Sequence, residues 1–384
     1  MGATSCSRRK FMGALGAAAG AWLARPALSW ARADTPPRVA VGTCREYGPP
    51  MVDVLAKMFD QLGGLQKLVA GKTVAIKLNL TGSGSDRLGY VPIGLTQWVH
   101  PDVITATVHL LGQAGARRIR LLESAQSTAE PLDEFMLQAN WEPRRFASAA
   151  PRVEFENTNY LGSGKKYSRF WVPGGGVMFK GYDLNHSYED CDVFVSLAKM
   201  KEHACAGVTL SMKNCFGITP CTIYGDGSPE NEPSLVPLGG RGPFHSGNRL
   251  PSKSAPPPGD GAKSKDAGFR VPSIVAELVA ARAVHLAIID GIYSMAGGEG
   301  PWIRGTRPVH PGILVAGLNC VSTDAVATAL MGFDPMADRG TPPFETSDST
   351  LRLAEHLGVG TRDLQQIEVV GTPISQARFD FRRA

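Results

Sequence analysis

The sequence contains no Cys-x-x-Cys pair, although seven of its residues are cysteines. Ferredoxin-type iron–sulfur clusters and zinc ribbons take their ligands from such closely spaced pairs. An iron–sulfur cluster is therefore not expected, whereas a metal of unknown identity, held by other ligands, stays open. The six isolated cysteines beyond residue 33 predict no particular disulfide pairing: Cys44, Cys191, Cys205, Cys215, Cys221 and Cys320.

The chain also lacks a charge excess once its first 33 residues are set aside. Of its 40 basic residues, five lie in that segment, which contains no acid, so the remaining 35 equal the 35 acidic residues. The formal charge of +5 therefore describes the N-terminus alone. Nothing in the composition predicts a nucleic-acid partner or binding to an anionic membrane surface.

Residues 1–33 have the pattern of a twin-arginine signal peptide. Arg8 and Arg9 precede an apolar residue, a mildly apolar segment covers residues 13–23, and residues 31–33 (Ala-Arg-Ala) offer a cleavage site. The apolar segment is shorter than the about 20 residues that a membrane span needs, so no stable span is expected after cleavage. We expect export to the periplasm with the twin-arginine translocase as partner. A Sec signal or a disordered basic N-terminus is the alternative.

The most informative segment is 191–219, which begins as a buried strand and then becomes basic. Lys199, Lys201 and His203 occupy alternate positions, so an extended chain places them on one face. After Gly207 the pattern becomes helical and includes Lys213. Ammonium groups and an imidazole are costly to hold together without an anion between them. The segment therefore predicts a binding site for a small anionic ligand. A solvated basic loop is the alternative.

Strands and helices alternate before this segment, which predicts an α/β fold with a parallel sheet. Lys77 and Asn79 stand at the carboxyl end of a predicted strand, where open parallel sheets bind ligands. His100 starts a helix, from which its imidazole could point into a cleft beside Lys77. Alternatively, Lys77 reaches solvent and His100 caps the helix. The predicted strands are 38–43, 72–80 and 116–123, and the helices are 49–69 and 103–114.

The second half of the chain resumes the alternation after a segment rich in Pro, Gly, Ser and Asn at 221–268. This segment is predicted to be an insertion, either a lid or disordered. A predicted strand at 284–289 then leads to Asp290, which could accept a proton, bind a metal, pair with the lysines or cap the turn. The following glycine-rich turn, 295–302, could bring backbone N–H groups to a phosphate or carboxylate, although it lacks the G-x-G-x-x-G spacing.

The predicted fold is therefore a two-lobed α/β body with mostly parallel sheets, flanking helices and a long Pro/Gly-rich insertion loop. The mature domain covers residues 34–384, with a first lobe at about 34–190 and a second at about 191–384. The functional cleft would lie between the lobes.

Several of these segments together resemble one family, and they follow its order across most of the mature chain: 74–79 (Val-Ala-Ile-Lys-Leu-Asn), 100–101 (His-Pro), 196–203 (Ser-Leu-Ala-Lys-Met-Lys-Glu-His), 210–217 (Leu-Ser-Met-Lys-Asn-Cys-Phe-Gly), 290–291 (Asp-Gly), 297–301 (Gly-Gly-Glu-Gly-Pro) and 319–324. The family is the domain-of-unknown-function 362 (DUF362) family, whose reaction is not generally established. Some members carry a cysteine-rich ferredoxin module, which this sequence lacks. The architecture is also distantly similar to the lactate racemase group, which places lysine and histidines around a nickel-pincer cofactor.

The first hypothesis for function is an exported enzyme that acts on a small anionic organic substrate. Lysines in a dry cleft would stabilise developing negative charge, a histidine would move a proton, and an aspartate would set its protonation. Lys77 could instead act as a nucleophile. The candidate catalytic residues are Lys77, His100, Lys199, Lys201, His203, Lys213 and Asp290.

The predicted ligand- or cofactor-binding residues are Asn79, Asn214, Gly297, Gly298 and Gly300. A second hypothesis is a metal- or cofactor-binding protein, iron–sulfur-related or nickel-pincer-like, with redox or isomerase activity. Its candidate metal ligands are His203, Cys205, Cys215 and Asp290. A third hypothesis is an anion-binding receptor without chemistry.

Overall fold

The computed structural model describes residues 35–125, 127–159, 166–228, 237, 239–245, 249–259, 266 and 268–384. The predicted signal peptide, 1–33, lies outside the described residues. So do parts of the predicted insertion at 221–268.

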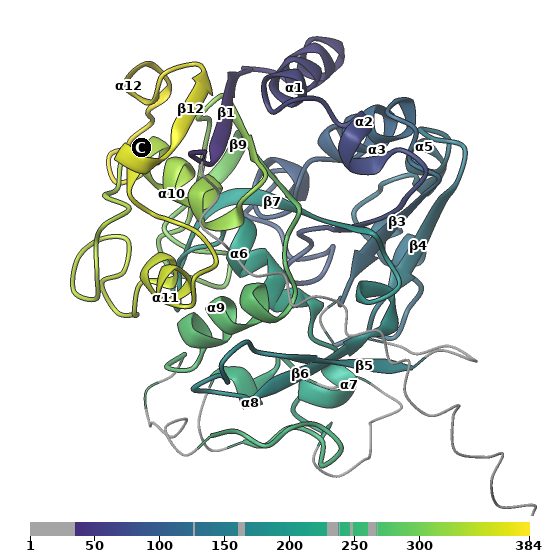
Figure 1. Cartoon of the computed structure of the whole chain (residues 1–384), viewed down its shortest axis with the longest axis vertical. Helices are drawn as coiled ribbons and strands as arrows, with labels where there is room; N and C mark the ends of the chain where they lie inside the picture. The colour runs from purple at the N-terminus through teal and green to yellow at the C-terminus, as the bar shows by residue number, and fades with distance from the viewer. Residues whose placement is uncertain are drawn as a thin grey trace, which may run out of the picture. The chain divides into compact units, whose positions relative to one another are not determined.

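A single mixed sheet of ten strands forms the centre of the described chain (Figure 1). The strands from β4 to β9 are mutually parallel, β11 runs antiparallel to both β9 and β1, and β12 is parallel to β1. The sheet order is β12 (Glu368–Gly371), β1 (Arg38–Thr43), β11 (Ile313–Gly317), β9 (Leu286–Ala296), β7 (Val193–His203), β2 (Thr73–Lys77), β3 (Arg118–Glu123) and β4 (Val153–Asn157), while β10 (Arg307–Val309) pairs with β9 and β8 (Gly207–Val208) pairs with β7.

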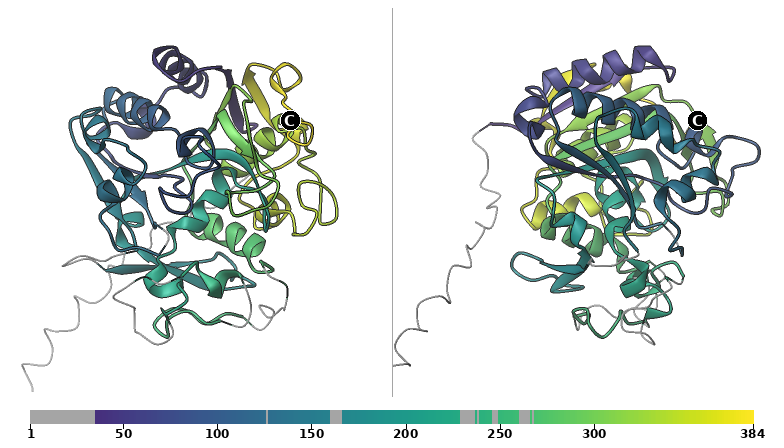
Figure 2. Two further views of the ribbon diagram at one scale, coloured as in Figure 1. Left: turned by 180° about the vertical axis from the view of Figure 1, so that it is seen from behind. Right: turned by 90° about the vertical axis from the view of Figure 1, so that its right-hand side faces the viewer.

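Helices cover both faces of this sheet (Figures 1 and 2). On one face an apolar cluster joins the sheet to α1 (Pro49–Gln61), α2 (Gln66–Val69), α3 (Pro101–Gln113), α4 (Leu132–Leu137) and α5 (Pro143–Ala147). The helices that pack on the other face and on one another are α6 (Leu210–Asn214), α9 (Val271–Ala281), α10 (Cys320–Leu330) and α11 (Thr350–His356). The central strands are buried on both sides, as expected for parallel strands with helices on both faces.

The remaining elements are short. A separate hairpin of β5 (Tyr167–Trp171) and β6 (Gly181–Asn185) lies near α7 (Cys221–Tyr224) and α8 (Gly242–His245), below the main sheet in Figure 1. The other short helices are η1 (Ile93–Leu95), η2 (His186–Tyr188), η3 (Cys215–Ile218), η6 (Leu364–Gln366) and α12 (Ile374–Ala377). The predicted insertion thus contains two short helices among its described residues.

The predicted α/β fold with a mostly parallel sheet is confirmed, with local differences. The predicted helix 49–69 is broken because Gly63 and Gly64 adopt positive φ values of 99° and 81°, which end α1 before α2 begins. The strand predicted at 284–289 continues to Ala296, beyond Asp290. Strands from both predicted lobes belong to the one sheet.

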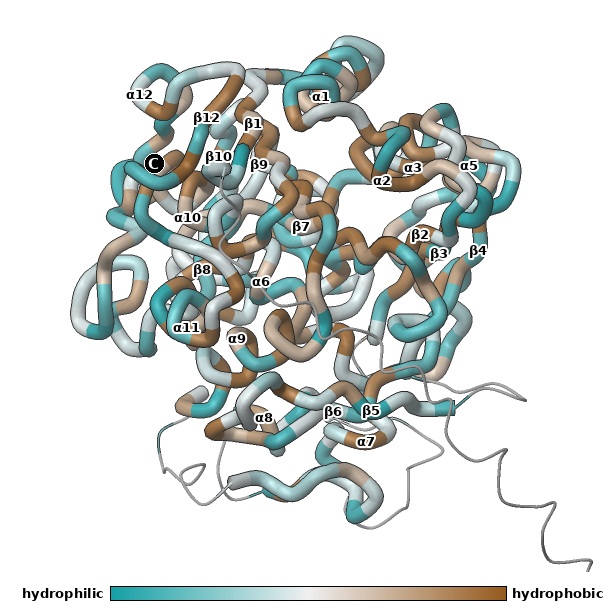
Figure 3. Tube along the Cα trace, viewed as in Figure 1, coloured by the Kyte–Doolittle hydropathy of each residue, from teal (hydrophilic) through white to brown (hydrophobic). Residues whose placement is uncertain are grey.

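Hydropathy follows this layering. Figure 3 shows apolar residues concentrated in the inner strands and helices and polar residues in the outer loops. The six cysteines beyond residue 33 are all unpaired in the described part of the chain. Of the helices that the structure describes, none has the length and apolar character needed to span a bilayer.

Candidate active site

A cavity of about 550 Å³ lies at the carboxyl ends of the parallel strands β2, β3 and β7. This edge is where open α/β sheets bind ligands, because the loops that leave the strands diverge there. Further lining comes from α6, η3, α8 and the loop after β9. The lining residues that bear on function are Lys77, Asn79, Glu123, His203, Thr209, Lys213, Asn214, Phe216, Gly217, Arg241, His245, Glu299 and Trp302.

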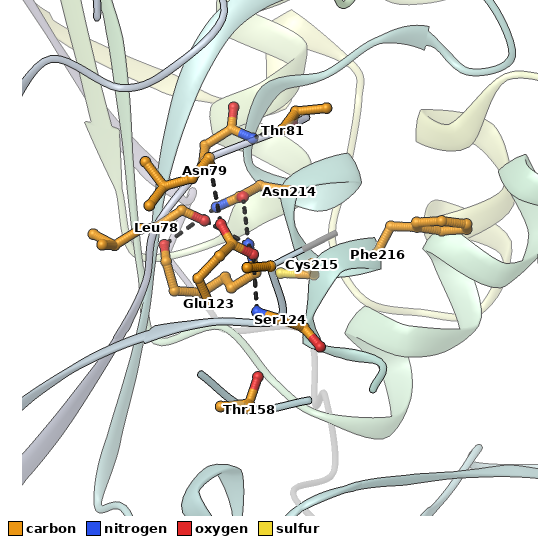
Figure 4. A network of polar contacts seen from close by, with 12 residues as sticks. Leu78, Asn79, Thr81, Glu123, Ser124, Thr158, Asn214, Cys215 and Phe216 are labelled. Atoms are coloured by element: carbon orange, nitrogen blue, oxygen red, sulfur yellow. Dashed lines mark hydrogen bonds and ion pairs between the residues drawn. The ribbon is translucent and has the colours of Figure 1, made fainter. Parts of the chain in front are cut away.

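Lys77 is held in this lining by three oxygen atoms. Its Nζ lies 2.6 Å from Glu123 Oε1, and it donates to Leu78 O at 2.5 Å and to Asn214 Oδ1 at 3.2 Å. Glu123 also accepts the backbone N–H groups of Leu80 and Ser124, at 2.9 and 3.0 Å (Figure 4). Burial lowers the Lys77 pKa, while Glu123 acts against this effect. The charge of Lys77 is therefore already balanced by the carboxylate of Glu123.

Gly217 makes room for this ion pair. A Cβ at position 217 would lie 2.9 Å from Lys77 Nζ and 3.2 Å from Glu123 Oε1, closer than ordinary packing allows. Asn214, four residues after Leu210 in α6, donates to Ser196 Oγ at 3.0 Å and so joins the helix to β7. The same segment therefore supplies both the space and the amide that fix Lys77.

Lys213 lies in the same lining but differs from Lys77 in its partners. Its Nζ is 4.1 Å from the centre of the Phe216 ring. Among the residues that the structure describes, it forms no hydrogen bond or ion pair with an oxygen atom. Burial lowers the Lys213 pKa to about 8, against an opposing effect of Glu299. Lys213 is partly buried at the cavity wall, and an ammonium there without an oxygen partner among the described residues favours an anion beside it.

The side chain of Thr209 adds a second unpaired group on the same helix face, four residues before Lys213. Thr209 is buried, lines the cavity, and its Oγ1 has no hydrogen-bond partner among the described residues. Leaving a buried hydroxyl unpaired costs about 1–3 kcal/mol.

Two histidines line the cavity with opposite tautomers in their neutral forms. His203 Nδ1 accepts the backbone N–H of Cys205 at 3.1 Å, so its proton is on Nε2. His245 Nδ1 lies 3.0 Å from the carbonyl oxygen of Arg241, which only accepts, so its proton is on Nδ1. Burial lowers both pKa values, and Lys213 acts in the same direction on each. One Nε2 is thus a donor and the other an acceptor at neutral pH.

The lining carries three cations and three carboxylates, but they are not evenly paired. Glu123 binds Lys77, and Glu299 and Asp86 accept the backbone N–H groups of Ala204 and Ser83. Arg241 donates only to backbone carbonyls and a hydroxyl, including Thr219 O at 2.9 Å and Ser124 O at 2.8 Å. Within the described residues, the positive charge without a carboxylate partner therefore lies at Lys213 and Arg241.

The glycine-rich turn contributes to the cavity through other residues than the predicted Gly297, Gly298 and Gly300. The N–H of Gly297 donates to Glu202 Oε2 at 2.6 Å, so this N–H group is already used within the protein. Gly298 and Gly300 leave space for the side chains of the same turn. The turn reaches the cavity with Glu299 and Trp302.

A second polar cluster forms around Lys199, away from the cavity lining. Lys199 Nζ lies 2.9 Å from Asp290 Oδ2 and donates to Gly94 O and Tyr47 OH, at 2.8 and 3.1 Å. The His100 ring stacks on Tyr47 with centroids 3.5 Å apart, and its backbone N–H donates to Asp290 at 2.9 Å. His100 Nδ1 caps α3 by accepting the N–H of Asp102, and burial lowers its pKa to about 4.

Lys201 belongs to neither cluster. Its buried Nζ donates to Gln97 O at 2.7 Å and Glu299 O at 3.1 Å. Burial lowers its pKa to about 7, with Glu299 opposing. Lys201 therefore joins two loops beneath the cavity instead of facing it.

Strand parity explains why the predicted residues divide into two groups. Ile76 and Leu197 belong to the apolar cluster under α1 and α3, so Lys199, two positions after Leu197, faces the same side. Lys77, one position after Ile76, faces the opposite side, toward α6. A register shift in the β7–β9 pairing between Lys199 and Lys201 then changes the direction of the strand end.

The predicted metal ligands do not come together. Cys215 Sγ donates to Ser211 O, and Asp290 is bound to Lys199. Among the described residues, no three His, Cys, Asp or Glu side chains form a group that could hold a metal ion.

The family model for "Domain of unknown function (DUF362)" matches residues 74–329, which include the whole cavity lining. The chain belongs to the DUF362 family. A curated relative, the thylakoid-associated protein sll1697 of Synechocystis sp. (strain ATCC 27184 / PCC 6803 / Kazusa), is 25% identical over 283 residues, 73% of this chain and 70% of that protein.

Two solved structures are distantly similar to this DUF362 protein. One is a protein from Thermotoga maritima, with 14% identity, a TM-score of 0.33, and coverage of 68% of this chain and 55% of that one. The other is the lactate racemase apoprotein from Thermoanaerobacterium thermosaccharolyticum, with 11% identity, a TM-score of 0.33, and coverage of 72% and 54%. The chain thus spans little more than half the length of either.

The structure also adds residues to the predicted site of this DUF362 protein, among them Glu123, Arg241, His245 and Trp302. Glu123 carries a sequence signal, since it is a charged residue at the carboxyl end of a predicted strand. Arg241 and His245 come from the insertion, whose lack of periodicity gives no indication of where they fold. Trp302 follows the glycines and would be found only by asking which side chain those glycines accommodate.

Proposed function

We propose that this DUF362 protein is an enzyme that binds a small organic anion in the cavity and transfers a proton at it. The observation that carries the proposal is the pair of cavity histidines, one presenting a proton on Nε2 and the other a lone pair. Positioned acids and bases of this kind contribute about 10²–10⁴-fold to reaction rates. Because both pKa values are lowered, both imidazoles are neutral and ready at neutral pH.

The cations would bind the anion, and the histidines would transfer the proton. Lys213 and Arg241 would hold the anionic group, with the Thr209 hydroxyl as a further donor. His245 would accept a proton at Nε2, and His203 would donate one from Nε2. The Lys77–Glu123 pair is internally neutralised and would shape the cavity, because preorganised dipoles stabilise developing charge without reorganising.

The experiment begins with a thermal-shift panel of small carboxylates and phosphates. Each acid that binds is then incubated with the protein in D2O, and NMR follows both C–H exchange and new products. We expect His203→Gln and His245→Gln to slow the reaction at least about 100-fold while binding changes little. Lys213→Met should weaken binding itself, and His109→Gln, on the exposed side of α3, should change neither.

The outcomes separate the hypotheses. An acid that binds through Lys213 but undergoes no exchange or turnover would favour a receptor. A stoichiometric transition metal in the purified protein would favour the metal- or cofactor-binding alternative. We also propose that the predicted twin-arginine export places this activity in the periplasm, which fractionation of cells producing the full chain would test.

A further inference from the structure

The cavity is much larger than a bare anion requires. Its volume of about 550 Å³ falls within the range of about 300–1,000 Å³ that is typical of organic-ligand sites. Lys213, the lining lysine without an oxygen partner among the described residues, accounts for one anionic group. The remaining space must accept the body of the ligand, so the lining away from this lysine determines which body fits.

Trp302 is the large aromatic side chain that is both part of this lining and open to solvent, with 46% of its surface exposed. Its indole is fixed in place, because Nε1 donates to Glu299 Oε1 at 3.2 Å. The other aromatic residue of the lining, Phe216, is buried and covered by Lys213 on its face and by His245 at its edge.

Two glycines accommodate the indole. A Cβ at Gly300 would come within 2.3 Å of its ring carbons, and a Cβ at Gly82 within 2.8 Å. These residues belong to the loops after β9 and β2, so both loops are shaped around the ring. An aromatic surface that is fixed before binding loses little conformational freedom when a ligand stacks on it.

Glu299 couples this surface to the proton-transfer group. Its Oε1 accepts from Trp302, while its Oε2 accepts the N–H of Ala204 at 3.0 Å and lies 3.7 Å from His203 Nδ1. One carboxylate therefore holds the indole by one oxygen and, by the other, the backbone of Ala204, the residue next to His203. A ligand ring stacked on Trp302 would thus lie on a surface that is joined to the segment carrying His203.

We infer that the ligand is an aromatic acid, with its ring on the Trp302 indole and its anionic group at Lys213. This inference rests on the proposed function and specifies its substrate class. Stacked aromatic pairs gain affinity beyond the area they bury. Trp302 then acts as a specificity residue, selecting flat rings over saturated ones of equal size.

The test uses benzoate, cyclohexanecarboxylate and acetate as probes, titrated by calorimetry into the full chain. We expect benzoate to bind at least about fivefold more tightly than cyclohexanecarboxylate. Trp302→Ala should remove this preference, whereas Trp302→Phe should retain it because the ring face remains. Trp171→Ala, which removes an indole 60% exposed on β5, is the matched control and should change nothing.

Each result decides between the two claims. If benzoate and cyclohexanecarboxylate bind equally, or if Trp302→Ala keeps the preference, the aromatic inference is wrong while anion binding stands. If none of the three acids binds the wild-type protein, both the anion site and the inference fail. Benzoate-induced quenching that disappears in Trp302→Phe while affinity persists would locate the ring at this indole.

Discussion

At the scale of single residues, the partners of a lysine decide what it can do. Lys77 and Lys199 each have a carboxylate within 3 Å, at 2.6 and 2.9 Å, and Lys201 donates to two carbonyls. Lys213 has only an aromatic face among the described residues. Four lysines that look alike in the sequence therefore have different roles, and Lys213 is the one available to a ligand.

Lys199 and Lys213 should respond oppositely to substitution. Lys199→Met leaves Asp290 buried without its cation, and breaking a buried pair costs about 3–5 kcal/mol. We expect this loss in urea unfolding, with the affinity for a cavity anion unchanged in the fraction that folds. Lys213→Met should weaken anion binding and leave the free energy of unfolding nearly unchanged or raised, because it removes a partly buried charge that has no partner among the described residues.

The double variant Lys199→Met/Asp290→Asn provides the control. It removes both charges together, so it should recover much of the stability that Lys199→Met loses. If Lys199→Met instead abolished anion binding while the protein stayed stable, the separation into a structural cluster and a cavity cluster would be wrong.

At the scale of elements, helix α6 brings Thr209 and Lys213 into the cavity. The helix has five residues, too few to be stable alone. Asp324 of α10 holds its first turn, accepting the N–H groups of Ser211 and Met212 at 2.9 and 2.8 Å. Burial raises the Asp324 pKa to about 8, which means that the ionised carboxylate is unfavourable inside the protein.

Asp324→Ala should therefore disturb the cavity from a distance. It leaves two backbone donors unpaired, which we expect to lower the free energy of unfolding by about 1–3 kcal/mol. Because α6 also carries Lys213, anion affinity should fall as well, and calorimetry measures it. Asp324→Asn keeps an acceptor oxygen, so its free energy of unfolding and its anion affinity should lie between those of the wild type and Asp324→Ala. Asp363→Ala, which removes the cap of the surface helix η6, should affect neither quantity.

At the scale of the whole molecule, much of the fold is predictable from the sequence because each central strand is a short apolar run between turn signals. Residues 72–80 and 116–123 predicted β2 and β3, and their parallel pairing follows from the helix between them. The antiparallel placement of β11 between β9 and β1 is not predictable locally. Its pairing with β1 joins segments more than 250 residues apart.

The site was only partly predictable, because a local sequence pattern shows where a strand ends but not which distant segments meet it. Lys77, Asn79, His203, Lys213 and Asn214 line one cavity because they follow strand ends at one edge of the sheet. His100, Lys199 and Asp290 meet in a separate cluster, since parity directs Lys199 to the other face. The residues that complete the cavity, Arg241 and His245, come from a segment with no periodic pattern.

The lowered pKa values of two lysines predict how the stability of the whole protein depends on pH. Lys201 and Lys213 have folded pKa values of about 7 and about 8, below the ordinary value of 10.5. Between these values and 10.5 the unfolded chain binds more protons than the folded one, so stability rises with pH in that interval. Buried cysteines such as Cys215 and Cys320, whose pKa values burial raises, act in the opposite direction above about pH 8.5. We therefore expect the lysine contribution as a difference: from about pH 8 to about pH 9.5 the melting temperature of the wild type should rise relative to that of Lys213→Met.

Two variants and a ligand test whether these lysines cause the rise. Lys213→Met should reduce the slope, whereas Lys57→Met, at an exposed position of α1, should not. A saturating cavity anion should also reduce it, because an anion beside Lys213 raises the pKa of that lysine and keeps its proton bound in the folded state. The interval stops below pH 10, where buried tyrosines such as Tyr182, whose pKa is raised by burial, begin to act in the opposite direction. If the wild type and Lys213→Met showed the same pH dependence over this interval, Lys213 would be paired in solution, and the anion site would then lose its principal cation.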